Sequence, residues 1–277
     1  MSDRRSLLRW LTAAPAGLAL ANLATGVAGA QQSAARNTAP QTVQDAVIPN
    51  LVGSEQIAML LYPGFTALDL VGPHFFFGCL AGARVHLVST QETLEPVVSD
   101  LMLAVQPTIR LSDVSDALDV VFVPGGSAGT LAAMQHQPTL EFLRTRGRAA
   151  RVKTSVCTGS FVLAAAGLLQ GKRATSHWLA RESLAAFGAI PIDERVVRDG
   201  DTITGAGVSA GLDMGVAVVE ALRGRPYAQA LMLQAEYAPQ PPVVGGRPEN
   251  TDPAITQMLR GRSQFRANAE AIAAGRQ

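Results

Sequence analysis

The sequence predicts an α/β domain in which helices sandwich a mostly parallel sheet, with a small hairpin and a C-terminal helix added to it. Short runs rich in Val, Ile and Leu alternate with longer segments of helical character. Near-continuous apolar runs are typical of strands that are buried on both faces. Strands that alternate with helices favour a parallel sheet that is covered on both sides.

The predicted strands and helices alternate along the chain, and turn residues end several of them. Strands are expected at residues 57–62, 83–89, 118–126 and 151–160, the first ending at Pro63-Gly64 and the third in a Gly pair. Helices are expected at residues 65–80, 127–134, 138–150, 160–169, 211–223 and 226–237. Residues 196–200 and 201–205 are expected to form a hairpin that turns at Asp199-Gly200. A Pro- and Gly-rich stretch then precedes a last helical segment at residues 252–274.

Composition excludes several classes of protein. The 277 residues are 48% hydrophobic and 16% charged, unlike disordered, collagen-like or coiled-coil chains. The net charge is +1 and the domain contains no run of Lys and Arg, which argues against a nucleic-acid partner. The two cysteines, Cys79 and Cys157, do not form a disulfide framework, and no Cys/His spacing suits a structural zinc site.

The first 30 residues are predicted to be a twin-arginine-type signal peptide. Arg4-Arg5 precedes a mildly apolar, Ala-rich stretch that ends in Ala28-Gly29-Ala30, a pattern that suits signal peptidase. Pro15 and Gly17 make the stretch a poor spanning helix, so no stable membrane insertion is expected after processing. The expected location is periplasmic or secreted in a bacterium. Residues 31–54 are expected to be a disordered tether, 55–242 the α/β domain and 243–277 a C-terminal helical extension.

Cys157 is the strongest candidate for a functional residue. It directly follows the apolar strand 152–156, and Thr158-Gly159-Ser160 can begin a helix. A side chain at such a strand-to-helix turn is presented as in a nucleophile elbow. The start of a helix favours a thiolate, and the N–H groups of Thr158 and Gly159 can bind an oxyanion. The alternative is a buried, inert cysteine.

Three further features lie near predicted strand ends, where ligands bind in such sheets. Asp69 can serve as a proton donor or water activator toward Cys157, or as a charge at a helix start. His177 can activate a thiol, or pack beside Trp178. The Gly125-Gly126 pair lets the backbone approach a ligand closely, or only makes a turn.

These motifs together resemble the ThiJ/PfpI family. The matching stretches are LLYPGFTALDLVGP (60–73), VFVPGG (121–126), TSVCTGSFVLAAAGLLQGKRATSHW (154–178) and ERVVRDGDTITGAGVSAGLDM (194–214). The late EYAPQPP (236–242) and the Cys-Thr elbow are most similar to the isonitrile hydratases of that family. The resemblance covers residues 56–242 and implies the flavodoxin-like, class I glutamine-amidotransferase-like fold. It also implies a homodimer.

By this resemblance the activity is addition of water to an isonitrile, which gives an N-substituted formamide. Cys157 would be the nucleophile that forms a thioimidate, with Asp69 supplying a proton and activating water, and with Thr158 orienting the groups. Gly126, Gly159 and His177 would be supporting or oxyanion residues. Apart from the second copy in the homodimer, the partner implied is a small-molecule substrate, and no metal or organic cofactor is needed.

Two features depart from the wider family, and other functions stay open. Many relatives have Cys-His at the elbow, and many have a Glu where this chain has Asp69. A glyoxalase- or deglycase-like enzyme or a redox sensor would use the same reactive Cys157. A non-enzymatic ligand-binding module would use the same fold. A transcription regulator is disfavoured, because only 35 residues follow Pro242.

Overall fold

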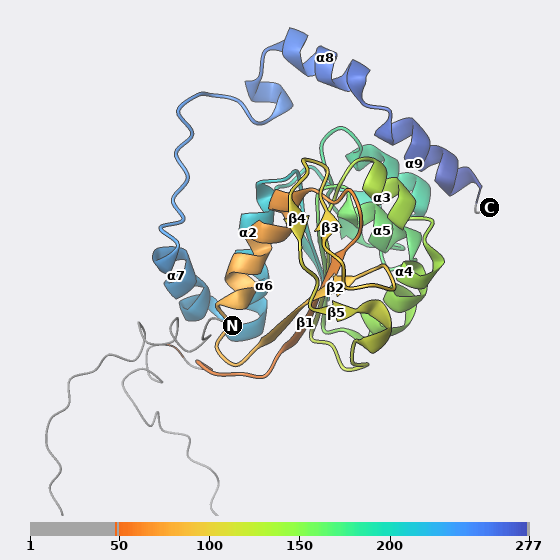
Figure 1. The fold of residues 1–277 in the computed structure, drawn as a ribbon. Helices are drawn as coiled ribbons and strands as arrows, with labels where there is room; N and C mark the ends of the chain where they lie inside the picture. The colour runs from red at the N-terminus through yellow and green to blue at the C-terminus, as the bar shows by residue number, and fades with distance from the viewer. Residues whose placement is uncertain (1–47, 49, 276–277) are drawn as a thin grey trace, which may run out of the picture. The chain divides into compact units, whose positions relative to one another are not determined.

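The computed structural model describes residue 48 and residues 50–275 (Figure 1). The predicted signal peptide, residues 1–30, lies outside this part of the chain, as does most of the predicted tether. Export therefore stays a prediction. In the part of the chain that is described, no helix is long and apolar enough to cross a membrane.

A seven-stranded sheet forms the centre of the domain. The order of its strands is β10–β11–β7–β6–β1–β2–β5, and every neighbouring pair is parallel except the β10–β11 hairpin. The strands are β1 (Gln56–Leu61), β2 (Arg84–Ser89), β5 (Ile109–Arg110), β6 (Val120–Val123), β7 (Val152–Val156), β10 (Val196–Asp199) and β11 (Thr202–Gly205). This topology confirms the predicted parallel sheet and its hairpin. The central strands β1 and β6 are buried along nearly their whole length, as their apolar sequences predict.

Helices cover both faces of the sheet (Figure 1). On one side lie α2 (Ala67–Gly78), α6 (Ala210–Arg223) and α7 (Arg225–Gln234). On the other lie α3 (Ala128–Ala133), α4 (Gln137–Phe142), its π-helical continuation η3 (Leu143–Gly147) and α5 (Gly159–Ala165). Phenylalanines fill the space between the layers: Phe76 and Phe77 of α2, Phe122 of β6 and Phe161 of α5 are all fully buried.

The C-terminal part differs in detail from the prediction. Residues 252–274 form two helices, α8 (Pro253–Arg262) and α9 (Phe265–Ala274), because Ser263 is extended and ends the first helix. Helix α9 packs on α3 and on the 3-10 helix η4 (Arg181–Phe187), with the Phe265 ring 5.2 Å from that of Phe161. A 3-10 turn, η5 (Pro248–Asn250), precedes α8.

Several short elements have no counterpart among the predicted ones. These are β5 of the main sheet, the pair β3 (Val97–Val98) and β4 (Ala104–Val105), the 3-10 helix η2 (Leu111–Asp113) and β9 (Ile190–Pro191), which pairs with β8 (Arg173–Ala174) just before His177. Each of these strands is two residues long. Two residues are too few to show an apolar alternation.

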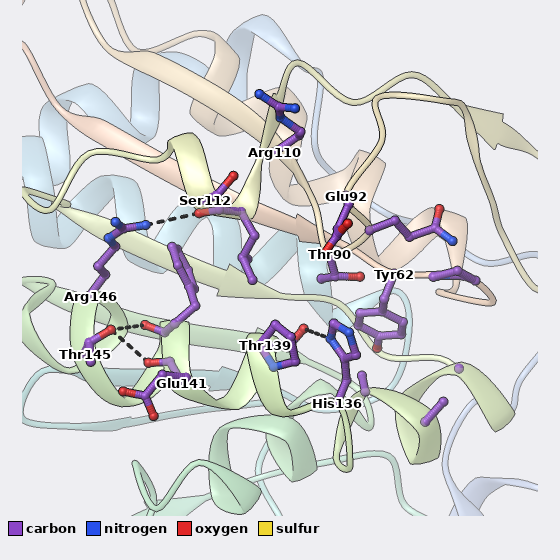
Figure 2. A pocket seen from close by; sticks show the side chains of 18 of the residues that line it. Tyr62, Thr90, Glu92, Arg110, Ser112, His136, Thr139, Glu141, Thr145 and Arg146 are labelled. Carbon is purple, nitrogen blue, oxygen red and sulfur yellow. Dashed lines mark hydrogen bonds between the residues drawn. The ribbon is translucent and has the colours of Figure 1, made fainter.

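A cavity of about 1080 Å³ lies where β1, β2 and β5 end, beside α3 and α4 (Figure 2). Its wall includes the Tyr62 ring, Thr90, Leu111, His136 and Phe142. Figure 2 shows the His136 ring beside Thr139, whose hydroxyl lies 2.8 Å from Nδ1. The cavity therefore lies on the α3–α4 side of the strand ends.

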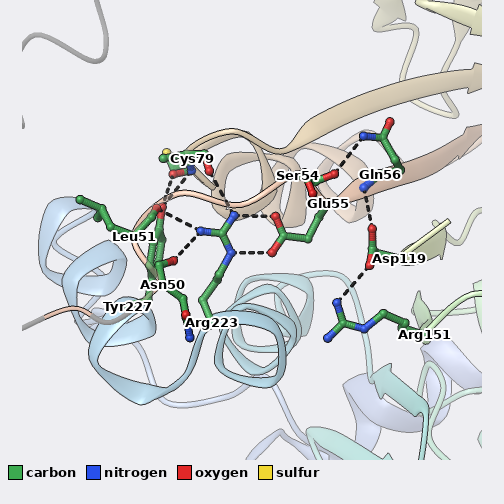
Figure 3. Close-up of polar contacts among 11 residues, drawn as sticks. Asn50, Leu51, Ser54, Glu55, Gln56, Cys79, Asp119, Arg151, Arg223 and Tyr227 are labelled. Atoms are coloured by element: carbon green, nitrogen blue, oxygen red, sulfur yellow. Dashed lines mark hydrogen bonds and ion pairs between the residues drawn. The ribbon is translucent and has the colours of Figure 1, made fainter. Parts of the chain in front are cut away.

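The segment that enters β1 is fixed by a buried ion pair. The guanidinium of Arg223, at the end of α6, bonds both carboxylate oxygens of Glu55 (Figure 3). Arg223 also donates to the carbonyls of Asn50, Leu51 and Ala81. Residues 50–54, the last part of the predicted tether, are thus held against the domain.

Candidate active site

Three segments that are far apart in sequence meet at the carboxyl edge of the sheet. Asp69 lies in the first turn of α2, Gly125 follows β6 and Cys157 follows β7. A Cβ atom at Gly125 would lie 2.6 Å from Asp69 Oδ2, 2.7 Å from Cys157 Cβ and 2.8 Å from Thr158 N. Only glycine fits at this position, because a larger residue would collide with both the Asp69 carboxyl and the Cys157 side chain.

Cys157 occupies a strained turn between β7 and α5. Its φ is +57°, a left-handed conformation that costs a residue with a side chain about 1–3 kcal/mol. Its N–H donates to the carbonyls of Gly205 and Ala206, and its own carbonyl accepts from the hydroxyls of Ser160 and Ser176. These four bonds hold the strained turn, as expected of a nucleophile elbow.

Asp69 is a buried carboxyl without a cationic partner. Its side chain is fully buried, Oδ2 accepts from the Gly125 N–H at 2.8 Å, and Oδ1 has no hydrogen-bond partner. Burial raises the pKa of Asp69 to about 7, with a further upward contribution from the charge of Asp100. The Gly125 N–H and the Cys157 thiol act in the opposite direction. Near neutral pH this carboxyl can therefore both give and take a proton.

The Cys157 thiol is held in its neutral form. Burial raises its pKa far above the usual range for cysteine, and the nearby charge of Asp69 adds to the effect. The pKa is lowered in part by the N–H groups of Thr158 and Val208 and by the Thr158 hydroxyl, because nearby N–H and O–H dipoles favour a thiolate. A base must therefore remove the thiol proton, and the neighbouring Asp69 carboxylate can serve as that base.

The Thr158 hydroxyl is part of a buried polar cluster. Its Oγ1 accepts from the Gly126 N–H at 3.0 Å and donates to the Gly126 carbonyl at 2.6 Å. It also lies 3.0 Å from Thr130 Oγ1, which in turn lies 3.0 Å from the Tyr62 hydroxyl. Sequence reasoning missed Thr130, for which no motif gives a signal. Tyr62 could have been found, because it is the last residue of the first predicted strand, at the edge where ligands bind.

The other predicted site residues, Gly126, Gly159 and His177, make contacts with the neighbouring backbone. The N–H of Gly126 is occupied by Thr158, and a Cβ atom at Gly159 would meet the Val123 carbonyl at 2.3 Å. His177 Nδ1 accepts from the Leu179 N–H at 3.3 Å, and burial lowers the pKa of His177. In the part of the chain that is described, no hydrogen bond joins His177 to Cys157.

The arrangement suits covalent chemistry by a thiol with an acid–base partner beside it. Cys79 and Cys157 are both free thiols, so no disulfide between them blocks the elbow. Among the residues that the structure describes, no group of three or more His, Cys, Asp or Glu side chains could hold a metal ion.

Comparisons with known proteins agree with this geometry. The model of the DJ-1/PfpI family matches residues 55–221. The isonitrile hydratase of Pseudomonas putida is 46% identical over 208 residues, which are 75% of this chain and 90% of that protein. The crystal structure of a ThiJ/PfpI family protein from Pseudomonas syringae has a TM-score of 0.80 at 45% identity, covering 86% of this chain and 98% of the other.

A more distant relative is named for a different activity. A glutathione-independent glyoxalase of Caenorhabditis elegans is 26% identical over 132 residues, 47% of this chain and 69% of that enzyme. The family model covers more than half of the chain, and the parallel sheet with a cysteine elbow matches the ThiJ/PfpI resemblance. The chain belongs to the DJ-1/PfpI family.

Proposed function

We propose that this protein hydrates isonitriles to N-substituted formamides, with Cys157 as nucleophile and Asp69 as its proton partner. The observation that carries the proposal is the pairing of a buried, neutral thiol with a carboxyl whose pKa burial raises to about 7. The 46% identity to an isonitrile hydratase supports the choice of substrate class.

In the first half-reaction the sulfur adds to the terminal carbon of the isonitrile, R–N≡C. The Asp69 carboxylate takes the thiol proton as the new S–C bond forms, which relieves the cost of a buried thiolate. The same proton is then delivered to the isonitrile carbon. The product is a thioimidate, R–N=CH–S–Cys157, and Asp69 is again a carboxylate.

In the second half-reaction water adds to the thioimidate carbon. Asp69 takes a proton from the water and passes it to the nitrogen, giving a tetrahedral R–NH–CH(OH)–S adduct. The C–S bond then breaks, and the hydroxyl proton returns to the sulfur through Asp69. The formamide R–NH–CHO leaves with the thiol regenerated, so atoms and charge balance without a metal or cofactor.

Thr158 is proposed to stabilise the negative charge that develops on the sulfur. Its N–H is placed to donate to the Cys157 thiolate, whereas its hydroxyl donates to the Gly126 carbonyl at 2.6 Å. Donors that are already in place when charge develops contribute strongly, because little reorganisation is needed in a buried site.

The test is turnover of a small alkyl isonitrile by the wild type and by Cys157→Ala, with formamide followed by chromatography. Loss of the nucleophile is expected to lower the rate by about 10³-fold or more. A well-matched control is Cys79→Ala, which removes the other free thiol and is expected to keep full activity. If wild type with a free thiol forms no formamide, the hydratase proposal is wrong, and dicarbonyl turnover then tests a glyoxalase-like activity.

A homodimer is also proposed, on the evidence of an exposed apolar surface beside the site. Helix α2 and the turn between β3 and β4 are adjacent, since the Thr66 hydroxyl donates to Asp100 at 2.5 Å. Their apolar side chains that are more than a third exposed are Leu68, Val71, Phe75, Leu101, Met102 and Leu103. An apolar patch of this kind marks an interaction surface, and a second copy of the chain would cover it.

Sedimentation of Val71→Glu tests the dimer. This variant places a charge in the patch and is expected to sediment as a monomer, whereas wild type sediments as a dimer. Leu233→Glu is the matched control, because Leu233 is an exposed apolar residue on α7, outside the patch. A monomeric wild type, or a Val71→Glu variant that stays dimeric, contradicts this assignment of the interface.

A further inference from the structure

The cavity of about 1080 Å³ lies outside the candidate active site, since neither Asp69 nor Cys157 lines it. Its wall is built where three parallel strands end: Tyr62 directly follows β1, Thr90 follows β2 and Leu111 follows β5. Ligands of open α/β sheets bind at the carboxyl ends of the strands. The volume is close to the upper end of the range for sites of small organic molecules, so position and size both suit a ligand.

Apolar side chains form most of the inner wall of this cavity. Tyr62, Ala133 and Phe142 line it and are at most 5% exposed. The Tyr62 hydroxyl donates to the Pro124 carbonyl and contacts the Thr130 hydroxyl, so the ring is the part of Tyr62 that a ligand can meet (Figure 2). Removal of apolar surface from water against such a wall favours a ligand with an apolar body.

The two arginines of the wall are already paired with acidic groups. Arg146 Nε donates to Asp116 at 2.7 Å, and its Nη1 donates to the Leu111 carbonyl at 3.1 Å. Arg110 Nε donates to Asp113 at 2.8 Å. An anionic ligand would compete with these carboxylates, and it therefore gains little from either arginine.

The other charged groups of the wall lie in solvent. Glu92 and Glu141 also line the cavity, and both are exposed. An ion pair with an exposed carboxylate contributes little, so a cationic ligand gains little from them. Their negative charge, with that of Asp116, also disfavours an anion. The wall therefore favours an uncharged molecule.

Thr90 is the buried polar group that a ligand can reach. It is 8% exposed and lines the cavity, and its hydroxyl makes no hydrogen bond to any residue that the structure describes. Buried hydroxyls are nearly always bonded, so this one favours a ligand that supplies a partner. A hydroxyl both donates and accepts, and an alcohol, a carbonyl or an amide suits it.

We propose that this cavity binds an uncharged, mainly apolar molecule with one alcohol, carbonyl or amide end. The apolar body packs against the rings of Tyr62 and Phe142, and the polar end bonds the Thr90 hydroxyl. The molecule binds without a covalent bond to a thiol, because no cysteine is among the described residues that line the cavity. This second site does not depend on the proposed hydration of isonitriles.

The test is equilibrium dialysis of the full-length protein with 2-naphthalenemethanol, an uncharged aromatic alcohol. The comparison probes 2-naphthoate and 2-naphthalenemethylamine keep the ring and carry an anionic or a cationic end instead. The alcohol is expected to bind at least about tenfold more tightly than either ion, because each ion loses hydration without gaining a free partner of opposite charge.

Thr90→Val removes the hydroxyl and keeps the shape of the side chain. It is expected to weaken binding of the alcohol about fivefold, the effect of one hydrogen bond. The probe 2-methylnaphthalene, which lacks the hydroxyl, is expected to bind Thr90→Val at least as tightly as wild type. Thr90→Ser keeps the hydroxyl and is expected to bind the alcohol as wild type does.

Ala132→Trp locates the bound probe. Ala132 is exposed on α3 and lines the cavity, so an indole there fills the cavity and is expected to weaken binding of the alcohol by more than about tenfold. Ala271→Trp is the matched control at an exposed alanine of α9, outside the cavity, and is expected to bind as wild type does. Ala149→Trp, at a second exposed alanine of the wall, replaces Ala132→Trp if the latter does not fold.

Three results overturn the proposal. The first is a wild type that does not bind the alcohol, and the second is tighter binding of the naphthoate or the amine. The third is full binding by a folded Ala132→Trp variant, which would assign the probe to another apolar surface. Equal binding of the alcohol by wild type and Thr90→Val overturns the role of Thr90 and, with it, the polar end assigned to the ligand.

Discussion

Two buried carboxyls, Asp69 and Glu55, lie in opposite electrostatic settings. Glu55 faces the guanidinium of Arg223, and both of its oxygens are bonded (Figure 3). Asp69 faces a neutral thiol, and one of its oxygens has no partner. Burial raises the pKa of both, but for Glu55 the bonds and charge of Arg223 outweigh burial and the pKa falls, whereas for Asp69 it rises to about 7.

The difference separates a group that stabilises the fold from one that moves a proton. A carboxylate with a cation beside it stays charged at every physiological pH and fixes the chain segments that it joins. A carboxyl without one is costly when charged, and it can exchange a proton near neutrality. The comparison predicts that changes at Asp69 and at Glu55 affect different properties of the protein.

The largest expected effect is on catalysis by Asp69→Asn. The amide can still accept from the Gly125 N–H but cannot take the Cys157 proton, so formamide turnover is expected to fall by about 10³-fold. The free energy of unfolding at neutral pH is expected not to fall, because a neutral amide replaces a carboxyl that burial disfavours when charged. Steady-state rates and denaturant unfolding measure the two properties. An active Asp69→Asn variant would contradict the acid–base role.

A smaller effect is expected from Glu55→Gln, and on stability alone. Removing the charge leaves the buried Arg223 guanidinium without its counterion, which is expected to lower the free energy of unfolding by about 3 kcal/mol. The double variant Glu55→Met with Arg223→Met, which buries no charge, is expected to recover most of this loss. The kcat of Glu55→Gln is expected to match wild type. An equal loss of kcat and stability would show that the two carboxyls are not independent.

The sequence predicted the sheet and the elbow because both depend on local signals. The buried runs at 57–62 and 118–126 are apolar along most of their length, and Cys157 directly follows a strand of this kind. Parallel strands bring their carboxyl ends to one edge, so the convergence of Asp69 and Cys157 followed from the order of elements.

The buried polar cluster around Thr158 and the short strands could not be predicted in the same way. Thr130 and Thr158 are 28 residues apart, and their contact depends on how α3 packs on α5. The two-residue strands β3 and β4 take their place from tertiary contacts such as that of Asp100 with Thr66. The pairing of Glu55 with Arg223 joins residues 168 apart, a distance over which no sequence pattern operates.

The smallest expected effect is a pH dependence of stability with opposite signs for the two carboxyls. The pKa of Asp69 rises from an ordinary 3.8 to about 7 on folding, so between these values the folded state holds a proton that the unfolded state has released. The stability that this group contributes is complete below pH 3.8 and is lost as the pH rises toward 7, by about 2 kcal/mol between about pH 5 and about pH 7.

The pKa of Glu55 is lowered on folding, so its contribution to stability is present above the ordinary value of 4.5 and is lost as the pH falls. Denaturant unfolding of wild type, Asp69→Asn and Glu55→Gln across this range separates the two contributions. Asp69→Asn is expected to abolish the loss toward neutral pH, while Glu55→Gln is expected to keep it, and a wild-type loss that survives in Asp69→Asn would assign the proton to another group.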